Sequence, residues 1–264
     1  FHERGYSYVD FNRASTPLME VVTEPDFRSP QEAKIFLQEL RLIARYLDLS
    51  DADMEKGHLR CDANISLRLL NEDGTTVGET FNPKTEIKNL NSFKAVERAL
   101  AYEIVRQKRL WERGTPPSIS TTRGWNDAKG LTEEQRAKES SEDYRYFPEP
   151  DVPPLELTAL ADEIRSLVPE LPAKRRERFV AEYHLTHEQS RAICEDVALA
   201  NYTERVFSEL EGWLDSLPEL DGAQDEHFVT YRKKLAKLVS GWLVSKLSGL
   251  LHARGQTFEE NPIT

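Results

Sequence analysis

The chain has 264 residues, of which 39% are hydrophobic and 31% charged, and its formal net charge is −11. This composition fits one large or two modest globular domains and excludes a disordered chain. The acidic balance argues against a general nucleic-acid binder, and no apolar run approaches the roughly 20 residues that a membrane span needs.

Two helices are predicted in the first half of the chain. A capping box of Ser29 and Glu32 precedes apolar residues at helical spacing, which predicts a helix over 30–48. A second amphipathic helix is predicted to begin near 91–92 and to stop near Gly114.

Strands are predicted around these helices. Residues 59–68 alternate strictly between apolar and polar side chains, which is typical of a half-buried strand. A second strand is expected within 84–91, and turn residues at 71–74 separate the two. Shorter strands near 6–9 and 20–22 complete a pattern that indicates an α+β fold with an antiparallel sheet.

A cluster of prolines at 148–154 divides the chain, because proline removes a hydrogen-bond donor and disfavours helix before it. We therefore predict two domains, a mixed domain over 1–154 and an all-α domain over 155–264. Acidic residues exceed basic ones on both sides, so the boundary is one of structure rather than of charge.

The second domain shows helical patterns. Thr158 is expected to cap one helix, and a capping box at Thr186 begins another. The longest amphipathic stripe runs over 231–250, with Trp242 expected in the core and Gly255 as the stop signal.

The polar faces of the two central strands carry the residues of chemical interest. They are Arg60, Asp62, Asn64 and Arg68 on the first strand and Lys84, Glu86 and Lys88 on the second. If the strands pair, Asp62 and Glu86 converge among cationic side chains. Carboxylates that bind Mg²⁺, surrounded by cations that hold phosphate oxygens, are what phosphoryl transfer from ATP needs. A sheet face laced with salt bridges is the alternative.

Three side-chain types have roles in this hypothesis. Arg60, Lys84 and Lys88 are the catalytic candidates, because cations offset the repulsion between a carboxylate and a triphosphate. Asn64 and Asn89 are candidates for orienting the substrate or metal-bound waters.

Two compact basic runs interrupt the acidic second half. One comprises Lys174, Arg175, Arg176 and Arg178, and the other lies within 232–237. Each is either a nucleic-acid contact or an ordinary solvated helix face.

Four blocks, at 8–26, 54–64, 84–92 and 143–151, strongly resemble the B subunit of the bacterial and organellar aspartyl/glutamyl-tRNA amidotransferases. The resemblance implies a partial, cradle-shaped, kinase-like domain followed by a helical tRNA-binding domain. It also implies that ATP phosphorylates the side-chain carboxylate of a glutamate or aspartate misacylated on tRNA. Ammonia, released from glutamine by a partner amidase, then displaces the phosphate to give glutaminyl-tRNA or asparaginyl-tRNA.

The resemblance assigns roles to individual residues. It makes Asp62 and Glu86 the ligands of Mg²⁺, with Glu55 as a further metal candidate or simply a turn residue. Candidates for contact with ATP or substrate are Asn64, Asn89, Arg136, Lys138, Tyr144 and Arg145, and those for contact with tRNA are Lys174, Arg175, Arg176 and Arg178. For Arg136 and Lys138 a surface loop is the alternative, and for Tyr144 it is anchoring of the proline-rich segment.

Partners implied by the resemblance are the amidase (A) subunit, the small C subunit and misacylated tRNA(Gln) or tRNA(Asn), with ATP and Mg²⁺ as cofactors and no membrane. The chain begins with Phe1 rather than Met, and by the resemblance it begins after the family's N-terminal metal ligands and ends where the tail domain should begin, so we expect a fragment that lacks both. No signal peptide is visible. Such a fragment is not expected to be active alone. Cys61 and Cys194 are expected to be free thiols, consistent with the cytoplasm or an organellar matrix.

Two other functions compete with this one. A non-catalytic tRNA-binding or assembly module of the same ancestry would lose the metal pair, so the presence of both Asp62 and Glu86 favours the enzyme. A free-standing kinase for a small carboxylic acid is disfavoured by the long helical region, which a small substrate does not need.

Overall fold

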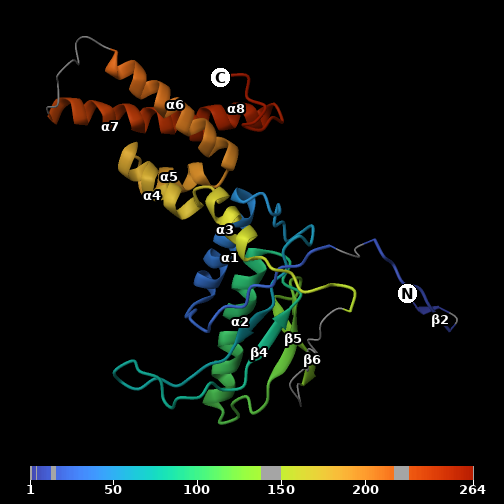
Figure 1. Ribbon diagram of the computed structural model, residues 1–264. Coiled ribbons are helices and arrows are strands. Elements are labelled where there is room, and N and C mark those ends of the chain that lie inside the picture. Colours follow the sequence, from blue (N-terminus) through green and yellow to red (C-terminus); the bar gives the residue numbers. More distant parts are fainter. Residues whose placement is uncertain (1, 4, 13–15, 138–149, 217–225, 264) are drawn as a thin grey trace.

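The computed structural model describes residues 2–3, 5–12, 16–137, 150–216 and 226–263, which form an α+β part and a helical part (Figure 1). The elements in chain order are β1 (His2–Glu3), β2 (Tyr6–Ser7), α1 (Pro30–Tyr46), β3 (Ala63–Ile65), β4 (Thr85–Lys88), α2 (Phe93–Glu112), β5 (Thr121–Asn126), β6 (Leu131–Ala137), α3 (Thr158–Leu167), α4 (Pro172–Glu182), α5 (His187–Cys194), α6 (Val197–Asp215), α7 (Glu226–Gly241), the π-helix η2 (Trp242–Leu247) and α8 (Ser248–Ala253). The predicted α+β class is confirmed.

The main sheet is mixed, with the strand order β3-β4-β5-β6. β3 pairs with β4, and β5 with β6, in antiparallel fashion. β4 and β5 run parallel, because α2 carries the chain from the end of β4 back to the edge where β5 begins. The prediction of an antiparallel sheet is therefore wrong for this pair of strands.

The two predicted helices of the α+β part are confirmed. The Ser29 hydroxyl accepts from the Glu32 amide and the Glu32 carboxylate accepts from the Ser29 amide, each at 3.2 Å, which completes the capping box. Ser92 caps α2 in a similar way, through the amide of Ala95. α1 and α2 lie side by side on one face of the sheet (Figure 1).

A single hydrophobic cluster joins these helices to the sheet. Its buried members are Leu37, Met54, Ile87, Leu90, Ala95, Val96, Ala99, Leu100 and Trp125. The alternation of β3 and β4 directs Ala63, Ile65 and Ile87 into this cluster. The polar residues between them therefore lie on the opposite, open face of the sheet.

Some strands are shorter than predicted. The segment 59–68 pairs only over Ala63–Ile65, and the segment 6–9 only over Tyr6–Ser7. No strand forms over 20–22, where the described residues have no regular structure. Several of their apolar side chains, such as Val22, are exposed, so no core holds this segment in a sheet.

The helical part has its own buried cluster. Its centre is made of Phe179, Ile193, Cys194, Ala200 and Leu243, and the capping box that begins at Thr186 is confirmed. The prediction for Thr158 is wrong, because α3 begins at Thr158 itself and has no side-chain cap.

The prediction that Trp242 lies in the core is wrong, since this side chain is 62% exposed. The stripe over 231–250 continues through three successive helices, and the π-helical winding begins at Trp242. Leu238, which lies four residues earlier on the same helical face, is exposed as well, whereas Ala236, Ser240 and Leu243 are buried at helical spacing. The buried face is therefore the one that carries Leu243, beside the one that carries Trp242. Gly255 follows the last helix with a φ of 66°, as the predicted stop requires.

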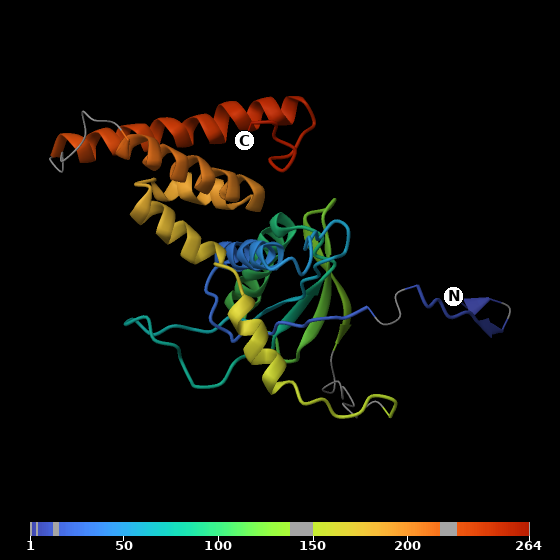
Figure 2. The same cartoon turned by 45° about the horizontal axis from the view of Figure 1, so that its top comes forward.

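The two parts meet where α4 and α5 lie over the end of α1 (Figure 2). The Tyr46 hydroxyl donates to the carbonyl oxygen of Cys194 at 3.0 Å, and Arg176 forms an ion pair of 2.8 Å with Glu39. Burial raises the pKa of Tyr46 well above its usual range, so its hydroxyl stays a donor. These contacts tie the orientation of the helical part to α1.

Both cysteines are free thiols, as predicted. Burial, aided by the charge of Asp62, raises the pKa of Cys61 to about 11, and burial also raises the pKa of Cys194. Neither thiol is therefore activated as a nucleophile. Within the described part of the chain, no helix is both long and apolar enough to cross a bilayer.

Candidate active site

The pairing of β3 with β4 brings the two predicted carboxylates together. Asn64 lies opposite Glu86 in the antiparallel register, as the predicted pairing of these strands requires. Lys88 Nζ lies 3.3 Å from Asp62 Oδ2 and 3.4 Å from Glu86 Oε1. Both carboxylates therefore approach one cationic group on the open face of the sheet.

The electrostatics of Lys88 follow from these two neighbours. Partial burial alone would lower the pKa of Lys88, but the charges of Asp62 and Glu86 outweigh it and raise that pKa. Lys88 thus remains an ammonium at neutral pH and occupies the position that a small cation between the two carboxylates would take.

β5 contributes a residue that the sequence did not reveal. The hydroxyl of Thr122 donates to Glu86 Oε2 at 3.0 Å, and Thr122 is only 2% exposed. Thr122 pairs with Glu86 in the parallel register of β4 and β5. Its role could be found only by knowing that pairing, since the two residues lie 36 positions apart.

A second feature of β5 is the space above Gly124, which pairs with Lys88. A Cβ atom on Gly124 would lie 2.5 Å from Gln135 Nε2 and 3.0 Å from Asn89 Nδ2. Asn89 itself has a φ of 62°, a conformation that asparagine tolerates better than most residues. The predicted Asn89 and the unpredicted Gln135 therefore converge beside Lys88, with Gly124 as the floor.

Three other predicted residues of the sheet are more exposed than Glu86 and Lys88. Arg60 and Lys84 are exposed, and neither forms an ion pair with another described residue. Asn64 is exposed on the same face as Glu86. In β6 the backbone of Arg136 pairs with Thr122, which itself pairs with Glu86. Arg136 is therefore the last of four residues paired across the sheet, of which Asn64 is the first.

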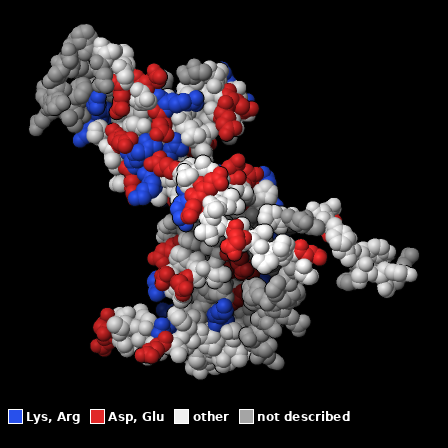
Figure 3. Space-filling view, viewed as in Figure 1, with Lys and Arg blue, Asp and Glu red and all other residues white. Residues whose placement is uncertain are grey.

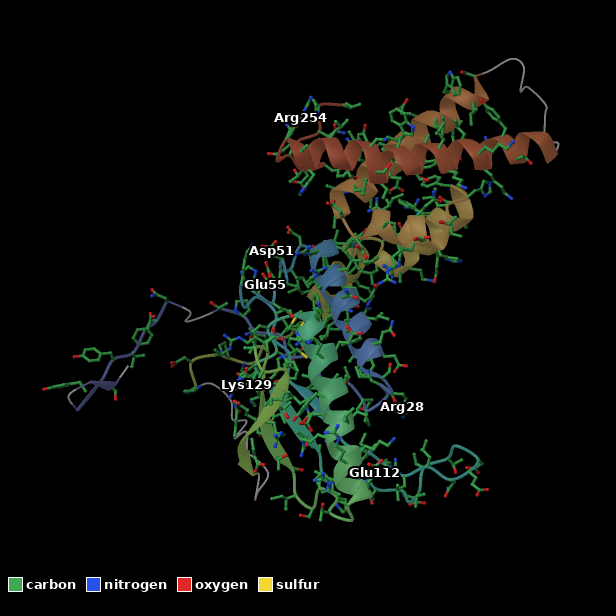
Figure 4. All side chains as sticks on the ribbon, turned by 180° about the vertical axis from the view of Figure 1, so that it is seen from behind. Arg28, Asp51, Glu55, Glu112, Lys129 and Arg254 are labelled. Atoms are coloured by element: carbon green, nitrogen blue, oxygen red, sulfur yellow. The ribbon has the colours of Figure 1, made fainter. Side chains whose placement is uncertain are left out.

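Four predictions are placed elsewhere or cannot be placed. Glu55 is exposed on a turn, where its amide donates to Asp53, and it lies with Asp51 at the end of the α+β part opposite Glu112 (Figure 4). Lys138, Tyr144 and Arg145 lie outside the described residues.

The first basic run is largely engaged in ion pairs. Arg175 is nearly buried, bonds Glu204 at 2.6 Å and lies over the ring of Phe179. Arg178 lies 2.7 Å from Glu170 and 2.6 Å from Glu204, and its hydrogen bonds to Glu170 above all raise its pKa.

Acidic and basic side chains are interspersed over this part of the surface (Figure 3). Arg176 is bound to Glu39, whereas the side chain of Lys174 is 77% exposed. The tRNA contact of this run stays a prediction, and structural roles account for its arginines.

The donor set fits a divalent cation held together with phosphate. Among the described residues no group of three or more Asp, Glu, His or Cys side chains is arranged to hold a metal ion. Mg²⁺ typically takes only one or two protein carboxylates and completes its shell with water and phosphate oxygens. Asp62 and Glu86 supply such a pair.

A mixed sheet that presents two carboxylates around a lysine, joined to a helical region, defines a two-part α+β protein with a candidate cation- and phosphate-binding face. Residues 1–162 match the model of the GatB/GatE catalytic domain. The chain belongs to this family, which confirms the resemblance stated above.

Curated relatives agree with this assignment. The B subunit of the aspartyl/glutamyl-tRNA(Asn/Gln) amidotransferase of Thermomicrobium roseum is 45% identical over 253 residues, which cover 95% of this chain and 46% of the relative. Proteins of the same name from Roseiflexus sp. and Persephonella marina are 49% identical over 205 residues and 40% identical over 263 residues. These alignments cover 77% and 99% of this chain and 41% and 49% of the respective relatives, so the chain spans about half their length.

Proposed function

We propose that the chain forms part of the kinase-like site of an aspartyl/glutamyl-tRNA amidotransferase. In that reaction the complete protein uses ATP to activate the side-chain carboxylate of the glutamate or aspartate misacylated on tRNA. The observation that carries the proposal is the convergence of Asp62 and Glu86 on the ammonium of Lys88, which occupies the position that a small cation would take. Membership of the GatB/GatE catalytic-domain family supports it independently.

The proposed reaction has two steps. An oxygen of the side-chain carboxylate of the tRNA-bound glutamate or aspartate bonds to the γ-phosphorus of ATP, the bond from that phosphorus to the β,γ-bridging oxygen breaks, and ADP leaves. Ammonia then attacks the activated carbonyl carbon, and phosphate leaves. Mg²⁺, when bound, supplies charge neutralisation at the phosphates.

The residues of the chain prepare this reaction. Asp62 and Glu86 would hold Mg²⁺, and Lys88 sits beside them to offset the negative charge of phosphate and carboxylate. Arg60 and Lys84 are proposed for the same task, and Asn64 and Asn89 for orienting the substrate. Glu55 would join only if its turn approached the two carboxylates in the complete protein.

The partners proposed are the amidase and C subunits and a misacylated tRNA(Gln) or tRNA(Asn). The names of the relatives support this proposal, because they describe a subunit of an amidotransferase that acts on such tRNAs. The cytoplasm or an organellar matrix is the proposed location, where translation supplies these substrates.

The decisive experiment measures tRNA-dependent ATP hydrolysis by the full-length parent subunit assembled with its partners. We expect Asp62→Ala to reduce hydrolysis about 100-fold or more while tRNA binding is retained, because charge stabilisation at the phosphates is lost. Asp73→Ala, on the exposed turn between the two strands, is the matched control and should leave hydrolysis unchanged. Undiminished hydrolysis by Asp62→Ala would show instead that this sheet face is a structural salt-bridge array.

A further inference from the structure

A buried ionic cluster lies beneath the candidate site, on the face of the sheet that α2 covers. Glu103 of α2 is 0% exposed. Arg106 Nη2 lies 2.8 Å from its Oε2, and Arg123 Nε lies 3.2 Å from its Oε1. The hydroxyl of Thr132 in β6 donates to the same carboxylate. A buried carboxylate requires such partners, because unpaired burial of a charge is very costly.

The cluster also holds the residue before Glu86. Thr85 precedes Glu86 in β4 and is almost completely buried. Its hydroxyl accepts hydrogen bonds from Gln107 Nε2 at 3.2 Å and from Arg106 Nη2 at 3.4 Å. Side chains of α2 thus fix β4 directly behind the candidate metal ligand.

On β5 the cluster holds the residue after Thr122. Besides its bond to Glu103, Arg123 donates to the hydroxyl and to the carbonyl oxygen of Thr132 at 2.8 and 2.7 Å. Arg123 and Thr122 are consecutive in an extended strand, so their side chains point to opposite faces of the sheet. Anchoring Arg123 on one face therefore sets the direction of the Thr122 hydroxyl on the other.

This anchor matters because the strand ladder is irregular at that point. The pairing of β5 with β6 shifts between Thr122 and Arg123. The extra residue of this bulge is Gln135 of β6, so the ladder is interrupted on that edge of β5, while the pairing with β4 on the other edge is regular. The side-chain bonds of Arg123 to Glu103 and Thr132 add a fixed connection on the interrupted side.

We propose that Glu103 is a positioning residue for Glu86 and acts through Arg123 and the hydroxyl of Thr122. The inference rests on the proposed function, in which Glu86 binds a divalent cation. Loss of the Glu103 charge leaves Arg123 held by Thr132 and by the exposed Glu134 alone. Arg123 then loses its fixed orientation, the Thr122 hydroxyl holds Glu86 Oε2 less firmly, and the carboxylate binds the cation less tightly.

The test is a direct titration of Mn²⁺ into the full-length parent amidotransferase, without nucleotide. We expect Thr122→Val and Glu103→Gln each to raise the Kd for Mn²⁺ about tenfold, which is the usual effect of removing a group that orients a metal ligand. Thr122→Ser retains the hydroxyl and should bind Mn²⁺ as the unmodified protein does. If Glu103→Gln fails to fold, Thr122→Val still refutes the proposal when it binds Mn²⁺ as the unmodified protein does.

A control separates positioning from general stability. Val96 is buried in the hydrophobic cluster of α2 and belongs to no polar contact of the site. Val96→Ala should lower the Tm and leave the Kd for Mn²⁺ unchanged.

The outcomes distinguish this inference from the proposed function. If Glu86→Gln weakens Mn²⁺ binding but Thr122→Val does not, the positioning role is refuted and the metal role of Glu86 stands. If Glu86→Gln has no effect on Mn²⁺ binding, both are refuted.

Discussion

Lys88 is the central residue of the candidate site, because its ammonium lies where a metal ion would neutralise Asp62 and Glu86. Its ammonium is within 3.4 Å of both carboxylates. In the absence of nucleotide a divalent cation must therefore compete with a built-in counter-ion. In the proposed mechanism the same ammonium turns to the phosphates of ATP, whose charge would otherwise repel the attacking side-chain carboxylate.

This competition predicts two opposite effects of one substitution. Lys88→Gln should tighten Mn²⁺ binding roughly fivefold, because a positive charge next to the carboxylates is removed. The same substitution should reduce tRNA-dependent ATP hydrolysis about 100-fold, because the phosphates lose a cation. Lys129→Gln, which removes a lysine paired with Glu133 at the far turn of the sheet, is the control for both assays. Weaker Mn²⁺ binding by Lys88→Gln would contradict the competition.

The sequence predicted those residues of the site that one strand pair defines. Alternation alone put Asp62, Glu86 and Lys88 on one face, because the period of a strand is read directly from its side chains. Thr122 and Gln135 were missed, since their strands show no clear alternation and reach the site through a helical crossover. Glu103 was missed because a glutamate within a helix normally faces solvent.

Among the elements, α1 shows how strongly local chemistry fixes a boundary. Its capping box provides acceptors for the backbone amides of Ser29 and Glu32, and the helix begins where the sequence predicts. The direction of β5 depends instead on the edge of the sheet to which α2 returns the chain, and no local sequence pattern encodes that edge. Helix ends were therefore predictable, whereas the parallel pairing of the sheet was not.

The cap gives an element-level prediction. Ser29→Ala should lower the free energy of unfolding by about 1 kcal/mol, because the amide of Glu32 loses its acceptor. Urea unfolding of the 264-residue chain, monitored by circular dichroism, measures the change. Glu32→Gln keeps an acceptor for the Ser29 amide and should cost much less. Equal losses for the two variants would argue against the capping box as the cause.

For the molecule as a whole, the joint between its two parts accounts for much of the first basic run. Arg176 reaches across to Glu39 of α1, and Arg175 lies over Tyr46 at the end of the same helix. Charge at these positions therefore serves the arrangement of the two parts. A surface for tRNA has to be sought among side chains that this joint leaves exposed, such as Lys174.

Two charge reversals separate the joint from a tRNA surface. Arg175→Glu should destabilise the chain by about 3 kcal/mol, because Glu204 loses a nearly buried partner and a like charge replaces it. Lys174→Glu should change stability by less than about 0.5 kcal/mol. If this face binds tRNA, Lys174→Glu should also weaken binding and reduce its salt dependence by about one ion, by counterion release. Unchanged tRNA affinity of Lys174→Glu at low salt would exclude the face.

The helical crossover between β4 and β5 also sets the order in which parts of the protein can fold. The hydrogen bond between Glu86 and Thr122 spans 36 residues and forms only after α2 has folded back along the sheet. Contacts of such separation close late in folding, because the intervening chain must first lose its conformational freedom. A nascent chain that ends before β5 would already contain both carboxylates, yet Glu86 would lack the hydroxyl that orients it. The candidate cation-binding face is thus completed late in folding, after the helices that support it have formed.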